Sequence, residues 1–100
     1  MSNSHERFST INHWHISGLS LAGSYYEILV VECRNGKFYV EDWLGDVPGY
    51  PDIWQPNKSG ADQDEPHFFD SYEECLKHAV KTIAKVAGIP EDKVSIPEDD

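Results

Sequence analysis

The segment from Asp70 to Pro90 carries the clearest structural signal in the chain. Asp70 and Ser71 are each followed by a glutamate three residues later, the capping-box spacing that satisfies free amides in a first helical turn. Apolar residues then recur at helical spacing and form one stripe, which consists of Tyr72, Cys75, Leu76, Ala79, Val80, Ile83, Val86 and Ala87. Gly88 suits the left-handed position that ends a helix, and Pro90 prevents continuation. The sequence therefore predicts one long amphipathic helix.

Two strand-like segments joined by Asn35 and Gly36 precede this helix. Residues 25–33 and 38–44 are rich in β-branched and aromatic side chains, and Asn-Gly accepts the positive φ angles of a two-residue type I′ turn. The cross-strand partners are then Cys33 with Phe38, Val31 with Val40, and Leu29 with Asp42. We expect this mostly apolar face to meet the core. The opposite face mixes aromatic and acidic side chains, and we expect it to be half-exposed or covered by the leader or the long loop.

The remaining segments complete a small domain. Residues 11–21 alternate weakly, as an edge strand does, and residues 67–69 and 94–96 can each form a short strand. The expected fold class is α+β, with a small antiparallel sheet of three to four strands, centred on the Asn-Gly hairpin, packed against one long C-terminal helix. A chain of 100 residues suffices for one domain. The expected organisation is a flexible leader at residues 1–10, the domain at residues 11–96 with a long acidic loop at residues 45–66, and an acidic tail at residues 97–100.

Negative charge is concentrated in one third of the chain. Eighteen Asp and Glu against eight Lys and Arg give a net charge of −10. Residues 1–40 are neutral overall, whereas residues 41–74 carry ten acids against Lys58 alone, a net charge of −9. The negative electrostatic field of such a cluster of acids repels nucleic acid and attracts basic proteins. Direct binding of DNA or RNA is therefore not expected, although acidity can also serve solubility alone.

The apolar runs are short. The longest aliphatic run has four residues, Ile28–Val31, against the roughly 20 that a membrane-spanning helix needs. The first residues also lack the apolar stretch of a secretory signal. We therefore expect a cytoplasmic protein that does not bind membranes, in which Cys33 and Cys75 are reduced rather than joined in a disulfide.

Few residue combinations suggest catalysis. Cys75 and His78 are three positions apart on the predicted helix, and His13 and His15 can point the same way from a strand, so either pair can contribute to a metal site. A zinc site needs about four ligands, however, and Cys75 belongs to the apolar stripe. We expect a protein that is not an enzyme and binds no metal or other cofactor. The alternative from a different class is a metal-dependent hydrolase that uses one of these pairs.

Five short motifs follow one another in a recognisable order. They are Tyr26–Val31, the turn at Gly36, Phe38–Val40, Asp46–Tyr50, and Ser71–Leu76 with Ala79 and Ile83. Over about residues 25–96 this series resembles the HicB-like antitoxin domain, which reads strand, turn, strand, D-L-P-G-C and then T-x-E-E-A at the start of an amphipathic helix. The chain differs in its longer leader, in an insertion at residues 51–66, and in having no DNA-binding segment after the domain. It also has Tyr50 and Cys75 where the family usually has Cys and Ala.

The resemblance implies a small sheet against one helix, and a protein that neutralises a basic RNA-cleaving toxin by covering its RNA-facing surface. Together with the charge pattern, it favours an inhibitory binding protein that docks on a basic, nucleic-acid-binding protein. The expected partner-binding residues are Tyr39, Glu41, Asp42, Trp43, Asp46, Tyr50, Asp52 and Trp54, which combine aromatic anchors with steering carboxylates. One alternative is a nucleic-acid mimic of the anti-CRISPR or anti-restriction type. Another is a homodimer formed by pairing residues 11–21 of two chains.

Overall fold

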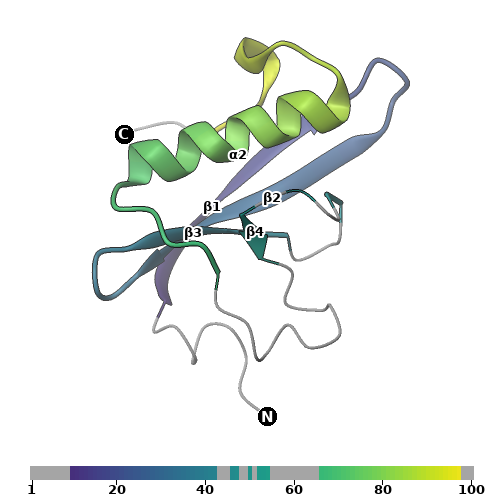
Figure 1. Cartoon of the computed structure of the whole chain (residues 1–100). Helices are drawn as coiled ribbons and strands as arrows, with labels where there is room; N and C mark the ends of the chain where they lie inside the picture. The colour runs from purple at the N-terminus through teal and green to yellow at the C-terminus, as the bar shows by residue number, and fades with distance from the viewer. Residues whose placement is uncertain (1–9, 43–45, 48–49, 51, 55–65, 98–100) are drawn as a thin grey trace.

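A four-stranded sheet packed against one helix forms the body of the protein (Figure 1). The structure is a computed structural model, and it describes residues 10–42, 46–47, 50, 52–54 and 66–97. Its elements are β1 (Thr10–Leu19), β2 (Tyr25–Cys33), β3 (Phe38–Glu41), β4 (Ile53–Trp54), α2 (Tyr72–Ala87) and the 3₁₀ turn η2 (Glu91–Lys93). The predicted α+β class is confirmed. The sheet is mixed rather than wholly antiparallel, because β4 pairs with β3 in parallel.

The helix α2 begins and ends where local signals place it. Ser71 has an extended backbone, and its Oγ accepts a hydrogen bond from the amide of Glu74 at 3.1 Å, so the second of the two capping frames is used. Gly88 ends the helix in the left-handed conformation, at φ 69°. The helix lies across one face of the sheet (Figure 1). Its buried side chains share a core with the sheet, formed mainly by Ile16, Ile28, Val30, Val40, Cys75, Ala79 and Ile83.

The pairing of β2 with β3 differs from the predicted register by one residue. Val30 lies opposite Val40, and Leu29 lies opposite Glu41, whereas the predicted register paired Val40 with Val31. A shift of one residue turns every β3 side chain to the other face relative to β2. The predicted core face was therefore wrong for β2, whose Val31 and Cys33 point away from α2, whereas Phe38 and Val40 of β3 do lie in the core as predicted. Ile28 and Val30 point toward α2, together with Val40.

The turn between these strands explains the shift. Cys33 donates its amide to the carbonyl of Lys37 at 2.8 Å, and Gly36 donates to the carbonyl of Cys33 at 3.0 Å. These bonds enclose a loop of Arg34, Asn35 and Gly36, in which Gly36 alone has a positive φ, at 86°. A three-residue loop that ends in a left-handed glycine is a common hairpin connection. The Asn-Gly pair is compatible both with this three-residue loop and with the predicted two-residue turn.

A second buried cluster covers the sheet face that points away from α2. Val31, Cys33, Tyr39 and Trp54 form it, with Leu29 and Phe68 packed against them. The ring of Tyr39 meets those of Trp54 and Phe68 edge-on, at centroid distances of 5.8 and 5.9 Å. All four residues of β3 are buried as a result. Both faces of this strand are thus enclosed within the protein.

Two predicted short strands are reduced to single bridges. Residues 67–69 meet β3 through an antiparallel bridge between Phe38 and Phe69, and Ser95 bridges Ser17 at the outer edge of β1. Most of the predicted leader, acidic loop and tail lies outside the described residues. Within the described ranges, no helix has the length and apolar character needed to cross a bilayer.

Candidate functional site

The predicted partner-binding residues do not form one exposed surface. Tyr39, Glu41, Asp42 and Trp54 are buried, with at most 7 % of each residue exposed. Asp46 and Tyr50 are half-buried, Asp52 is exposed, and Trp43 lies outside the described residues. An aromatic ring enclosed in its own core cannot serve as an anchor for a partner while the fold is intact. Tyr39 and Trp54 therefore stabilise the sheet instead.

Asp42 organises the chain that leaves β3. Its Oδ1 accepts a hydrogen bond from the amide of Asp46 at 2.8 Å, and its Oδ2 accepts one from the amide of Val47 at 2.9 Å. Asp46 in turn accepts the amide of Glu27, on β2, at 2.9 Å. Two carboxylates that the charge pattern assigns to a partner are thus acceptors for backbone amides. We call Asp42, Asp46 and their three amide donors the loop clamp.

Three exposed carboxylates from the described part of the acidic third lie at the start of α2. Asp70, Glu73 and Glu74 surround the first turn of the helix. Asp52 lies next to His67, with Oδ1 and Nδ1 3.7 Å apart. We call Asp70, Glu73 and Glu74 the acidic surface, to which Asp52 does not belong.

One lysine partly neutralises the acidic surface. Lys37, in the turn after β2, donates a hydrogen bond from Nζ to Asp70 Oδ1. This hydrogen bond, together with the positive charge of the lysine, lowers the pKa of the Asp70 carboxyl from its ordinary value. Asp70 therefore stays ionised at any pH near neutral.

The predicted metal-ligand pairs are not assembled into a site. In the part of the chain that the structure describes, no three His, Cys, Asp or Glu side chains are placed to hold a metal ion. His13 and His15 are exposed on β1, and His15 Nδ1 lies 2.9 Å from Glu27 Oε2. Cys75 is buried in the core, and this burial raises its pKa to about 12. Its thiol is therefore neither a ready metal ligand nor a nucleophile.

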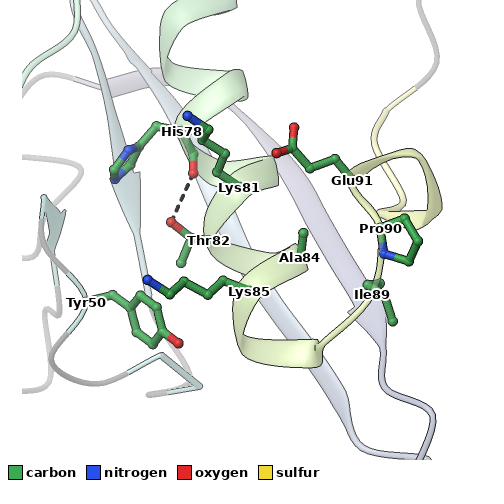
Figure 2. Close-up of a pocket in the computed structure, with 9 residues that line it drawn as sticks. All are labelled: Tyr50, His78, Lys81, Thr82, Ala84, Lys85, Ile89, Pro90 and Glu91. Atoms are coloured by element: carbon green, nitrogen blue, oxygen red, sulfur yellow. Dashed lines mark hydrogen bonds between the residues drawn. The ribbon is translucent and has the colours of Figure 1, made fainter.

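A groove of about 730 Å³ lies along the C-terminal half of α2 (Figure 2). It is lined by Tyr50, His78, Lys81, Thr82, Ala84, Lys85, Ile89, Pro90 and Glu91. Thr82 donates its hydroxyl to the carbonyl of His78 at 2.9 Å, so that its side chain is held against the helix. Figure 2 shows Tyr50 on one side of Lys81 and Lys85, and Glu91 on the other. We call this feature the lysine groove.

Local sequence accounts for only part of the lysine groove. Lys81 and Lys85 are four positions apart on the predicted helix, which does place them on one face. Tyr50, however, comes from the connection between β3 and β4 and reaches the groove only through the tertiary fold. No local pattern joins these residues.

Comparison of the chain with protein-family models, curated proteins and solved structures gives no match. The resemblance to the HicB-like antitoxin domain therefore stays a prediction.

Proposed function

We propose that the protein is a non-enzymatic, antitoxin-like inhibitor that docks through its acidic surface on a basic, nucleic-acid-binding protein in the cytoplasm. The observation that carries this proposal is the exposure of Asp70, Glu73 and Glu74 in a chain of net charge −10. Among the described residues, Asp70 is the one member of this surface that pairs with a lysine. The surface thus offers negative charge to a cationic partner.

Burial of Tyr39 and Trp54 changes what this surface contributes to binding. Exposed carboxylates mainly accelerate association and set its salt dependence, whereas affinity comes from desolvated anchors. Glu41 and Asp42, each 1 % exposed, add nothing to that attraction at short range. Among the described residues, the steering charges are therefore those around the start of α2 rather than Glu41 and Asp42.

A matched pair of variants tests the proposal. E73Q/E74Q removes two charges from the acidic surface, and glutamine still serves at the third position of a capping box. E91Q/D92N removes two charges from η2, which lies beyond the other end of the helix. Both variants therefore change the net charge from −10 to −8. We expect E73Q/E74Q to slow association and flatten its salt dependence, and E91Q/D92N to retain both.

The partner for this test is identified by affinity capture from native lysate at low and high salt, and association rates are then measured with the purified protein. Equal slowing by both variants would show that overall acidity, rather than the acidic surface, attracts the partner. Capture of proteins that are not basic would contradict the proposal altogether. If RNA competes with the protein for the captured partner, the result supports an antitoxin-like role. If duplex DNA competes instead, the result favours the nucleic-acid mimic.

A further inference from the structure

We propose that the lysine groove binds the phosphate group of an organic phosphate monoester, with Lys81 and Lys85 as its cationic ligands. This site is separate from the acidic surface and does not depend on the proposed docking function. In a chain with this excess of acids, two lysines that pair with no described carboxylate call for an anion from outside the protein.

Lys81 and Lys85 lie one helical turn apart and are both exposed. At this spacing their Cβ atoms are about 5–6 Å apart, and like charges repel. No carboxylate of the described residues lies within 4.0 Å of either ammonium group, although Lys37 does pair with Asp70. An anion placed between the two ammonium groups relieves this repulsion.

The anion is expected on the side of the groove that holds Tyr50. Figure 2 shows Glu91 on the opposite side of the two lysines, where its carboxylate disfavours a second negative group. The phenol of Tyr50 is a donor that an anionic oxygen can use. His78 adds an imidazole to the same part of the lining.

Phosphate fits this arrangement better than carboxylate does. A phosphate monoester carries a charge of about −1.5 to −2 at pH 7 and three strong acceptor oxygens, so one group can bridge two ammonium groups. A carboxylate carries only one negative charge and two acceptor oxygens. Lysine commonly binds phosphate as a point charge.

The rest of the groove suits the organic part of such an ester. Its volume of about 730 Å³ falls within the usual range of small-molecule sites, about 300–1,000 Å³. Tyr50 supplies an aromatic ring on the side expected for the phosphate, and Ala84, Ile89 and Pro90 line the groove on the side of Glu91 (Figure 2). An apolar or aromatic group attached to the phosphate therefore has surface to bury.

Phenyl phosphate is the first probe, followed by inorganic phosphate and benzoate, with amide and ring chemical shifts as the readout. We expect saturable shifts at Thr82, Lys85 and Tyr50 with phenyl phosphate. Binding of inorganic phosphate should be weaker, since it lacks the ring, and benzoate should bind much more weakly. Benzoate that binds as well as phenyl phosphate would overturn the proposal, and so would the absence of saturable shifts.

Two variants of equal charge complete the experiment. K81Q/K85Q removes the proposed ligands, whereas K77Q/K93Q removes two lysines that do not line the groove. Both variants change the net charge from −10 to −12. We expect K81Q/K85Q to weaken phenyl phosphate binding by about tenfold or more, and K77Q/K93Q to leave it nearly unchanged. Equal weakening of phenyl phosphate binding by both variants would mean that the phosphate responds only to net charge.

AMP and phosphoserine, compared on the wild-type protein, distinguish a nucleotide from a modified protein as the source of the ester. Binding of neither compound would overturn the proposal.

Discussion

Asp42 is a buried carboxylate with a structural task. Its two oxygens accept the amides of Asp46 and Val47, and 1 % of the residue is exposed. Burying a charged group is costly unless hydrogen bonds replace its water. The loop clamp supplies such bonds and, through Asp46, ties the chain after β3 back to β2.

Replacement of Asp42 by alanine should therefore lower the free energy of unfolding by about 3 kcal/mol, because the amides of Asp46 and Val47 lose their acceptor. Urea unfolding followed by circular dichroism measures the change. Asp92→Ala is the control, since Asp92 is exposed on η2, and its effect should stay within about 0.5 kcal/mol. Similar unfolding midpoints for the two variants would contradict the role given to the clamp.

Both cysteines illustrate how burial controls reactivity. Burial raises the pKa of Cys75 to about 12, with a smaller effect from Cys33. It also raises the pKa of Cys33, where the charge of Glu32 adds to the effect. Neither cysteine forms a disulfide in the structure. Their thiols are therefore neutral at physiological pH.

We expect both thiols to resist alkylation by iodoacetamide at pH 8 in the native protein. Only the thiolate reacts, and a pKa of about 12 leaves roughly one Cys75 thiol in ten thousand ionised at that pH. Mass spectrometry of samples labelled with and without denaturant provides the measurement. The unfolded chain should take up two labels quickly, and rapid native labelling of Cys75 would show that it is accessible and ionised.

At the scale of elements, α2 was predictable and the hairpin register was not. The signals for α2 are local: Ser71 binds the amide of Glu74, and Gly88 ends the helix within the same few residues. The register of β2 and β3 depends instead on which faces the whole fold buries. Because β3 is buried on both faces, its alternation pattern carries no information about which face meets α2.

The hairpin loop offers a direct test of the observed register. Gly36 has a positive φ and Asn35 does not, so Gly36→Ala should destabilise the protein by about 1 kcal/mol or more through backbone strain. Asn35→Ala loses one exposed hydrogen bond, from the amide of Lys37 to Oδ1 at 3.0 Å, and should cost less. A two-residue type I′ turn requires positive φ at both positions, so comparable losses in thermal unfolding would favour that turn instead.

For the molecule as a whole, the sequence located the acidic third of the chain but not the orientation of its carboxylates. Asp42 and Asp46 bind backbone amides, whereas Glu73 and Glu74 face solvent. This division follows from the path of the chain after β3, which composition does not specify. The lysine groove could not be predicted for the same reason, because it forms only where the fold brings Tyr50 next to α2.

The ion pair of Lys37 and Asp70 connects the β2–β3 hairpin to the start of α2 and predicts a pH effect. Because the pKa of Asp70 is lower in the folded state than in the unfolded state, the pair stabilises the fold above the ordinary value of 3.8 and loses this effect as the pH falls through the lowered pKa. Asp70→Asn should thus be slightly less stable than wild type at pH 7. Thermal unfolding at a series of pH values should show the difference disappearing in acid, and a difference that persists there would point to another cause.

Repulsion among the remaining charges predicts the response to salt. The chain carries 18 acids, and the described residues contain one lysine–carboxylate pair. Raising the ionic strength from about 0.01 M to 0.15 M shortens the Debye length from about 30 Å to about 8 Å and screens this repulsion. We therefore expect the Tm at pH 7 to rise with sodium chloride. The rise in Tm should be smaller for E91Q/D92N, whose net charge is −8, and larger for K81Q/K85Q, whose net charge is −12. A Tm that falls with salt would mean that attractive ion pairs outweigh the repulsion, and that the acids of this chain are neutralised within the fold rather than available to a partner.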